Sequence, residues 1–364
     1  MNLNIVSFLI VFFIFVFIIY PPYIKNSTSS LTYTKEYRLF SFFMFGIFLV
    51  FFYMMRKLFI GYDTYSYVSV FENIANCSAY KEISERHIAM GWEKLFVRFI
   101  YLISRISDNK YFFLFVIGTC LYFSIIYFIT SLSKNFLISI IFFVLYGFYF
   151  SSTNLMRQFC AISIVLFGVN FFLKKKYVRY YIVIFVASFF HTTALICVLL
   201  PIINIFKLKK SFIVFYFFVI TVLIFFSNNL LSFAIHYVAP QYESYFTSSS
   251  YGILSKSKLG SLLNLFIGVI LFIYFYSNYN EKDEIYSKLL KIFMFGLLFT
   301  AASAKFTQIG RIASYFSPSA FILISMGKKN ILFYFTFFIL IAYCVIVNLF
   351  RPEWTGFFPY YFDF

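Results

Sequence analysis

The stretch ILFYFTFFILIAYCVIVNLF, residues 331–350, decides the fold, because its twenty consecutive residues include no charged side chain. A helix of that length spans about 30 Å, the thickness of the hydrocarbon core of a bilayer. Similar runs recur along the chain, for example at 10–20, 40–55 and 138–150. The chain of 364 residues is 62% hydrophobic and only 12% charged. The sequence therefore predicts an integral membrane protein that crosses the bilayer several times.

Helices are the expected spanning elements, because a barrel needs strands of roughly ten residues that alternate between apolar and polar. The runs found here are apolar on every face. We expect an all-α polytopic integral membrane protein, a single membrane domain over 1–364, with about 11–12 transmembrane or half-membrane helices. The predicted helices lie at about 3–20, 38–55, 111–131, 135–153, 157–173, 179–190, 192–206, 212–232, 262–278, 290–305, 312–326 and 331–350.

Basic residues outnumber acidic ones, and the net charge is +17. They form short clusters between apolar runs instead of covering a soluble domain, so nucleic acid is not expected as a partner. The sequence contains no phosphate-loop, zinc-protease or nucleophile-elbow motif, and its three histidines lack the spacing of metal ligands. The five cysteines form no CxxC pair. We expect neither a metal nor a cofactor.

The stretch VASFFHTTALICV, residues 186–198, places a histidine in an apolar run between two basic clusters. Lysine and arginine favour the cytoplasmic side, and all the clusters can face it only if this segment crosses an even number of times. Residues 177–206 reach about 45 Å as a helix, which is too short for two crossings of a ~30 Å core. We therefore expect a helical hairpin of two short arms with His191 at its outer tip. The alternative is one tilted helix with His191 packed inside.

Most arginines fall on the outer side of this topology, against the rule for basic residues. Arginine binds phosphate through a planar fork, so this excess indicates an anionic ligand at the outer face. The alternative is that this excess of outer arginines arises by chance among a small number of residues and from contacts with anionic lipid head groups. The outer arginines are Arg56, Arg86, Arg98, Arg105, Arg157, Arg311 and Arg351.

Three predicted helices begin at the outer face with a cationic or titratable side chain. Arg157 follows three typical capping residues at 152–154, Arg311 follows a glycine, and His191 precedes two threonines. The N–H groups and the positive dipole end of a helix start favour phosphate. These three helix N-termini therefore predict a binding site for a diphosphate. For any one of them alone, an anchor at the membrane interface is the alternative.

Residues 56–110 form a large polar segment that we expect in the periplasm, and 233–261 form a second periplasmic loop. Within the first segment, MGWEKLFVRFIYLISRI at about 90–106 repeats apolar residues at helical spacing and gathers its cations on another side. It is expected to be an interfacial helix along the membrane surface. That placement puts Glu93 and Arg98 at the depth of lipid head groups.

Several short motifs follow one another along the chain: Gly61-Tyr62-Asp63 with Tyr67, Gly91-Trp92-Glu93, Arg157-Gln158 with Ala161, Ala187 to His191 followed by Ala194, Arg311 with Tyr315, and Pro359-Tyr360. In these motifs and their order, from about residue 40 onward, the sequence resembles the bacterial O-antigen and exopolysaccharide polymerases of the Wzy type, specifically the EpsG-like branch. Trp92 stands where the family pattern leads us to expect tyrosine.

The resemblance implies a metal-independent glycosyltransferase of the bacterial inner membrane, with its active site facing the periplasm and a role in lipopolysaccharide or other polysaccharide biosynthesis. Such an enzyme transfers a growing glycan from undecaprenyl diphosphate to a new lipid-linked repeat unit. A chain-length regulator is a candidate partner. Arg157 and Arg311 are expected to stabilise the leaving diphosphate, and His191, then Asp63, then Glu93 are the candidates for the base. The further candidates for substrate binding are Arg98, Tyr67, Gln158 and Tyr315.

A flippase of lipid-linked oligosaccharide is the main alternative, because it would share the helices, the arginines and the polyprenyl ligand. A transporter should carry cations on both sides of the membrane, whereas the arginine excess is one-sided. An O-antigen ligase or membrane acyltransferase also uses outward Arg and His, but the order of the motifs argues against it. A non-catalytic scaffold would not need arginines at helix starts.

Overall fold

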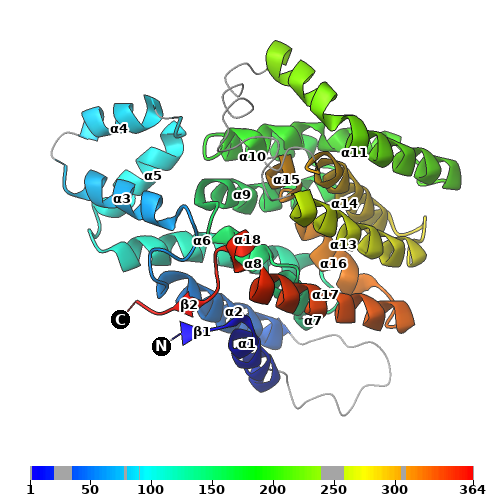
Figure 1. Ribbon diagram of the computed structural model, residues 1–364, viewed down its shortest axis with the longest axis horizontal. Coiled ribbons are helices and arrows are strands. Elements are labelled where there is room, and N and C mark those ends of the chain that lie inside the picture. Colours follow the sequence, from blue (N-terminus) through cyan, green and yellow to red (C-terminus); the bar gives the residue numbers. More distant parts are fainter. Residues whose placement is uncertain are drawn as a thin grey trace. The chain divides into compact units, whose positions relative to one another are not determined.

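Helices make up 78% of the described chain (Figure 1), which confirms the prediction of an all-α polytopic membrane protein. The one sheet within the described residues pairs β1 (Asn2–Leu3) with β2 (Tyr360–Tyr361) in an antiparallel arrangement. The computed structural model describes residues 2–19, 35–77, 80–89, 91–238, 258–304 and 309–363.

The chain forms two compact units, each with its own set of helices. The first contains Met1–Val198, Ile324–Met326 and Phe337–Phe364, and the second contains Leu199–Leu323 and Gly327–Thr336. In the first unit lie α1 (Ile5–Ile19), α2 (Lys35–Met54), α3 (Thr64–Ala75), α4 (Tyr80–Ala89), α5 (Lys94–Ser104), α6 (Lys110–Leu132), α7 (Phe136–Leu145), α8 (Phe148–Ser152), α9 (Met156–Leu173), α10 (Tyr177–Ser188), most of α17 (Ile331–Phe350) and α18 (Pro352–Thr355). In the second lie α11 (Lys210–Val238), α13 (Lys258–Ser277), α14 (Glu284–Ala302), α15 (Gly310–Ala313) and most of α16 (Pro318–Met326).

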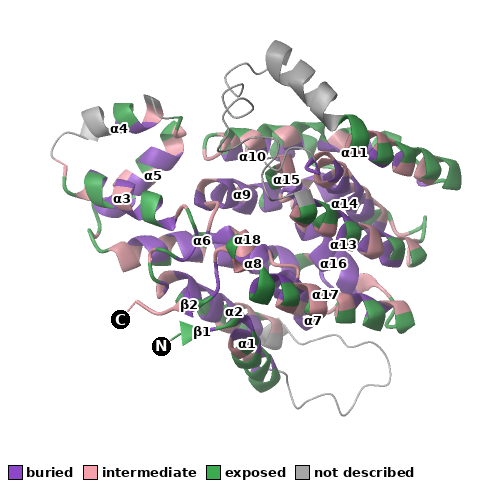
Figure 2. Ribbon diagram, in the orientation of Figure 1, coloured by how far each residue is buried: buried purple, intermediate pink, exposed green. Residues whose placement is uncertain are grey.

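In the first unit, α6 packs against both α2 and α9. A Cβ atom at Gly118 of α6 would lie 2.9 Å from a ring carbon of Tyr53 in α2, and one at Gly46 of α2 would lie 2.6 Å from the ring of Phe123 in α6. Small residues at these two points let the helices approach closely. Helix α9 is buried along most of its length (Figure 2). The first residues of α9, which include Arg157, are therefore held against closely packed helices.

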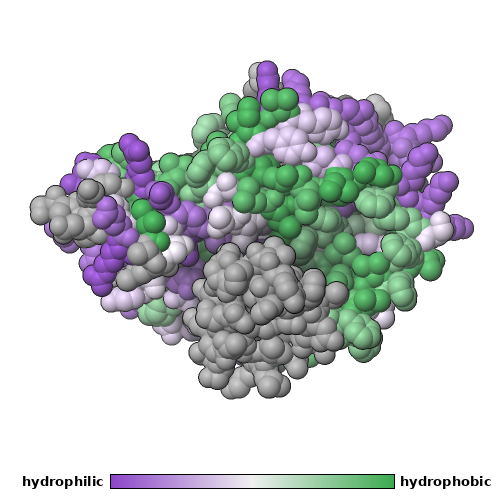
Figure 3. All heavy atoms as spheres, turned by 90° about the horizontal axis from the view of Figure 1, so that it is seen from above, coloured by the Kyte–Doolittle hydropathy of each residue, from purple (hydrophilic) through white to green (hydrophobic). Residues whose placement is uncertain are grey.

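Five described helices are long and apolar enough to cross a membrane, namely α6, α9, α13, α14 and α17. Six shorter apolar helical segments accompany them. Large apolar side chains are exposed over much of the described surface (Figure 3). Such a surface suits contact with lipid rather than with water.

Two of the predicted helices are interrupted. The predicted helix 135–153 is divided at Gly147, whose φ of 78° ends α7 and precedes α8. The predicted helix 312–326 is divided as well, because α15 ends at Ala313 and α16 begins at Pro318. Proline suits the first turn of a helix but not its interior. Arg311 therefore lies in a four-residue turn of helix and does not open a long one.

The chain reverses direction around His191, as the predicted hairpin requires. Helix α10 ends at Ser188, and a run of 3₁₀ turns, η1 (Thr192–Ile205), follows. The Tyr180 hydroxyl, in the first turn of α10, donates a hydrogen bond to the backbone oxygen of Cys197 in η1, so the two arms contact each other. Helix α10 has 12 residues, about 18 Å at ~1.5 Å per residue, and is shorter than a full membrane crossing, whereas the 14 residues of η1 reach about 28 Å at the ~2.0 Å rise of a 3₁₀ helix.

The described residues of the long segment 56–110 contain three helices before α6, of which the sequence predicted one. The expected interfacial helix at 90–106 is α5, which buries its apolar face against α3 and α4. Its placement along a membrane surface stays a prediction. The second predicted loop, 233–261, falls largely outside the described residues, because α11 is described up to Val238 and α13 from Lys258.

Candidate functional site

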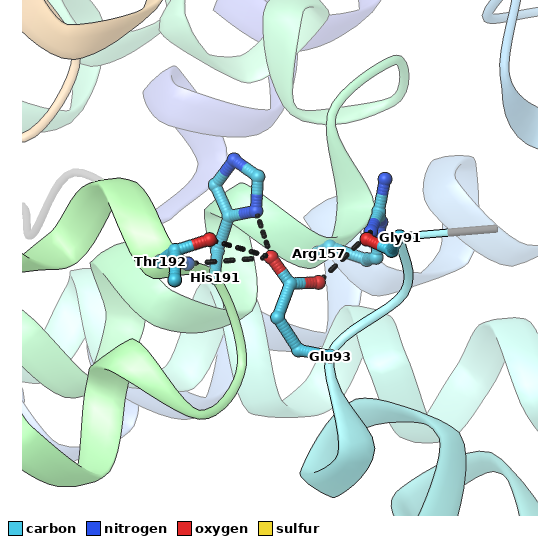
Figure 4. A network of polar contacts seen from close by, with 5 residues as sticks. All are labelled: Gly91, Glu93, Arg157, His191 and Thr192. Carbon is cyan, nitrogen blue, oxygen red and sulfur yellow. Dashed lines mark hydrogen bonds and ion pairs between the residues drawn. The ribbon is translucent and has the colours of Figure 1, made fainter. Parts of the chain in front are cut away.

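The carboxylate of Glu93 lies at the centre of a cluster of polar groups from three separate segments of the first unit (Figure 4). Glu93 directly precedes α5, and its extended backbone (φ −70°, ψ 134°) places it at the N-cap position. Two residues earlier, Gly91 has φ 83°, a left-handed conformation that glycine adopts readily. The Glu93 side chain is only 11% exposed, so its charge must be met by neighbouring groups.

Arg157, the second residue of α9, forms an ion pair with this carboxylate. Its Nη1 donates hydrogen bonds to Oε2 of Glu93 at 2.8 Å and to the backbone oxygen of Gly91 at 3.1 Å. The guanidinium carbon lies 4.9 Å from the centre of the Trp92 ring, close enough for a cation–π contact. The segment Gly91-Trp92-Glu93 thus holds Arg157 through three neighbouring residues, and 22% of the arginine side chain stays exposed.

His191 meets the other oxygen of the same carboxylate. Its Nδ1 lies 2.7 Å from Oε1 of Glu93, and its second ring nitrogen points away from the carboxylate (Figure 4). The backbone N–H and the hydroxyl of Thr192 donate to the same Oε1 at 3.3 and 3.4 Å. His191 is held in place because Glu93 forms hydrogen bonds with both the imidazole ring and the following residue, Thr192. The imidazole remains 23% exposed.

The charge state of Glu93 decides what the cluster can do. Burial raises the pKa of the Glu93 carboxyl, but the hydrogen bond and charge of His191, together with the charge of Arg157, lower it by more, and the net pKa lies below its ordinary value. Glu93 is therefore a carboxylate at neutral pH, and an ionised carboxylate can only accept hydrogen bonds. The shared proton then sits on Nδ1 of His191. In the neutral imidazole this leaves Nε2 with a lone pair that can take a proton.

Tyr67, one of the predicted binding residues, packs against the Trp92 ring and lies beside Arg157. The two ring centres are 5.3 Å apart, and Tyr67 is only 6% exposed. Burial raises the pKa of its phenol, although a hydrogen bond and the charge of Arg157 partly oppose this. Tyr67 is therefore a neutral hydrogen-bond donor at physiological pH. Asp63 lies one helical turn before it, near enough for its charge to act on the phenol.

The predicted capping residues before Arg157 do not cap α9. Leu155 holds the N-cap position, and no side chain bonds there. The hydroxyls of Ser152 and Thr153 donate to backbone oxygens of the preceding turn. Asn154 instead bonds to two distant segments. The expectation of a capped helix end was wrong, because short polar side chains also bond well within turns.

The structure brings some predicted residues into the cluster and leaves others outside it. Glu93 is in direct contact with both Arg157 and His191. Gln158 is buried at 3% exposure. Arg98 is exposed on the outer face of α5 and makes no hydrogen bond or ion pair within the described part of the chain. Arg311 is exposed and Tyr315 is buried in the second unit, so their proposed part in the same site stays a prediction.

Trp92 and Thr192 belong to the cluster, although neither was predicted as a site residue. A tryptophan gives little signal in a chain that is 26% aromatic, and a threonine gives even less. Within the described residues, no group of three His, Cys, Asp or Glu side chains is arranged to hold a metal ion. The described site thus offers a nitrogen base, a cation and hydrogen-bond donors.

The model of the EpsG family matches residues 39–362, which is most of the chain. Neither the curated proteins nor the solved structures contain a significant match. The matched region includes every residue of the Glu93 cluster.

Proposed function

Because the chain belongs to the EpsG family, a family of polysaccharide polymerase-like proteins, we propose that it is a Wzy-type glycosyltransferase acting on lipid-linked sugars. It transfers a growing glycan from undecaprenyl diphosphate to a new lipid-linked repeat unit at the periplasmic face of the bacterial inner membrane. The observation that carries this proposal is Glu93, whose two oxygens hold a histidine and an arginine side by side. This pairing supplies a base and an anion-binding group to one place.

The reaction needs a base for the acceptor sugar. Its hydroxyl oxygen attacks the anomeric carbon of the donor, a new C–O bond forms, and the hydroxyl proton must leave. Nε2 of His191 is the group that takes this proton, because Nδ1 is committed to Glu93. Glu93 orients the ring and stabilises the imidazolium that forms, as carboxylates do for histidine in other active sites. Asp63 remains the second candidate for the base.

The reaction also needs a partner for the leaving group. As the bond between the anomeric carbon and the diphosphate breaks, its electron pair stays on the bridging oxygen, and negative charge grows there. Arg157 is the cation that receives this charge, because its guanidinium is fixed beforehand by Glu93, Gly91 and Trp92. Fixed cations of this kind lower the barrier without any reorganisation during the reaction. Tyr67, a neutral donor beside Arg157, is suited to a sugar hydroxyl or a phosphate oxygen.

An assay of glycan extension by the purified protein in detergent tests the proposal, because a flippase has no reaction to perform without a bilayer. The purified protein is incubated with a synthetic polyprenyl-diphosphate-linked repeat unit, and the products are separated by length. We expect a ladder of longer glycans from the unaltered protein and none from His191→Gln. In cells that lack the protein, single repeat units on the outer leaflet support a polymerase. The same units confined to the inner leaflet would instead indicate a flippase and overturn the proposal.

A further inference from the structure

Asn154 joins three segments of the first unit immediately before α9 begins. Its Oδ1 accepts a hydrogen bond from the backbone N–H of Tyr62 at 2.7 Å, and its Nδ2 donates to the backbone oxygen of Thr355 at 2.6 Å. These partners lie 92 and 201 positions away in the sequence. An amide side chain carries an acceptor and donors in one plane, so it can bind two backbones at once. We call Tyr62, Asn154 and Thr355 the Asn154 clamp.

The turn at Gly61 fits closely against this clamp. Gly61 has φ 81°, and a Cβ atom there would lie 2.8 Å from the backbone oxygen of Thr153 and 3.1 Å from Oδ1 of Asn154. Its own N–H donates to the backbone oxygen of Gly356 at 2.8 Å. Only glycine combines this conformation with so close an approach. The turn that starts α3 is therefore fixed against the turn that starts α9.

A buried arginine supports the same contact. Arg56 is fully buried, and its Nη2 donates to the hydroxyl of Thr64 at 3.3 Å. That hydroxyl lies 3.2 Å from the backbone oxygen of Thr153 and 2.8 Å from that of Ile60. Burying a guanidinium away from water costs free energy. In some proteins such a buried charge fixes one particular geometry instead of adding stability. The sequence of contacts runs from Arg56 through Thr64 to the residues that precede Arg157.

We infer that Asn154 and Thr64 are positioning residues that hold the guanidinium of Arg157 in its working place. The inference rests on the proposed function, in which Arg157 binds the diphosphate. Asn154 precedes Arg157 by less than one helical turn, so any movement of this turn moves the guanidinium. Thr64 begins α3, and α3 carries Tyr67 to the Trp92 ring that Arg157 contacts. The two residues therefore fix the start of both helices around Arg157.

Inhibition by inorganic diphosphate reports directly on the position of Arg157. We expect Asn154→Ala to raise the Ki of inorganic diphosphate about tenfold. A change of this size corresponds to the loss of about one charge-assisted hydrogen bond between Arg157 and the diphosphate. The same variant should lower kcat/KM for the lipid-linked repeat unit by about 100-fold, because small displacements of a group that binds the reacting atoms are costly. Asn154→Asp keeps the acceptor for Tyr62 but places a carboxylate oxygen against the backbone oxygen of Thr355, so the Ki of diphosphate should rise in this variant as well.

Asn278 offers a matched control for the loss of an asparagine that bonds two backbones. It accepts from the backbone N–H of Lys328 at 2.8 Å and donates to the backbone oxygen of Tyr274 at 2.8 Å, all within the second unit. Asn278→Ala should lower the melting temperature as Asn154→Ala does and leave the Ki of diphosphate unchanged. Equal Ki values for the unaltered protein, Asn154→Ala and Asn278→Ala would overturn the positioning role.

A second pair of variants covers the case in which Asn154→Ala does not fold. Thr64→Val removes the hydroxyl at almost constant volume, and Thr64→Ser keeps it. We expect Thr64→Val to raise the Ki and Thr64→Ser to restore it. In an Arg157→Lys background, Thr64→Val should add little, because the group that it positions is already absent. An Arg157→Lys variant with normal Ki and activity would contradict the proposed function itself, whereas an inactive Arg157→Lys beside a normal Thr64→Val would contradict only the positioning role.

Discussion

Nδ1 of His191 lies 2.7 Å from Oε1 of Glu93, although the two residues are 98 positions apart in the sequence. The contact joins the tip of the hairpin to the turn before α5. It also fixes which nitrogen of the imidazole is committed and which is available. The position of the proton on Nδ1 follows from the ionised state of Glu93, and the chemistry that we assign to His191 depends on it.

Substitution of His191 by glutamine should stop chain extension and leave the fold intact. Glutamine can still bond to Glu93, but it has no lone-pair nitrogen that accepts a proton. General-base catalysis contributes about 10²- to 10⁴-fold in rate, so we expect a loss of kcat in this range with little change in KM. Extension assays with purified protein measure both constants. A rise in KM at constant kcat would show that His191 binds substrate and does not act as the base.

Arg157→Lys should abolish or strongly reduce extension at unchanged protein level. The guanidinium contacts Gly91, Trp92 and Glu93 together, and a lysine ammonium lacks the planar fork that allows this. Arg86→Lys is the matched control, because Arg86 is exposed on α4. The comparison is made by product length and by immunoblot of the membrane fraction. Full activity of Arg157→Lys would remove the arginine from the proposed mechanism.

The helices could be predicted because each apolar run must bury its backbone in lipid as a helix. The interruptions at Gly147 and Pro318 could not, because a glycine or proline in an apolar run does not reveal whether the helix bends or ends. The helices α3 and α4 were missed because they lie in a polar segment with no long apolar run. Apolar length is thus a sound guide to spanning helices and a poor one to the helices between them.

The members of the site could be predicted individually, but their contacts could not. Glu93, Arg157 and His191 are unusual as polar residues in or beside apolar stretches, and that made each a candidate. Only the folded chain shows that Glu93 stands between the other two. It also shows that Arg98 lies on the exposed face of α5. Asn154 forms hydrogen bonds with the backbone of Tyr62 and Thr355 instead of capping α9. Amphipathic spacing sorts side chains by face and does not say which partner covers each face.

Alanine at Gly61 should destabilise the protein far more than alanine at Gly91. Both glycines have a left-handed backbone, φ 81° and 83°, which costs an L-residue about 1–2 kcal/mol. At Gly61 the added methyl would also lie 2.7 Å from the Thr64 hydroxyl, whereas at Gly91 nothing lies within 4 Å. We expect Gly61→Ala to cost about 2–5 kcal/mol. Thermal unfolding in detergent measures both variants, and equal shifts would contradict the close packing at Gly61.

The arginines of the proposed site should face the outside of the cell. Single cysteines at positions 157 and 311, in a variant that lacks the five native cysteines, should react with a membrane-impermeant thiol reagent applied to intact spheroplasts. A cysteine at Lys175, in the turn between α9 and α10, should react only after lysis. Protection of position 157 until lysis would place the Glu93 cluster on the cytoplasmic side, and protection of position 311 would place Arg311 there. A diphosphate-linked donor on the periplasmic face could then not be the substrate of the cluster.

The ion pairs of Glu93 should contribute stability that depends on pH in one direction. The pKa of Glu93 in the folded protein lies below its ordinary value of 4.5. The contribution is therefore fully present above pH 4.5 and is lost as the pH falls through the lowered pKa. The unaltered protein should melt at a higher temperature than Glu93→Gln at neutral pH, and the difference should shrink as the pH falls below 4.5. Glu72→Gln, at an exposed position of α3, is the control and should show no such trend. A difference for Glu93→Gln that stays constant down to the most acidic pH at which the protein remains folded would show that the charge of Glu93 does not stabilise the cluster.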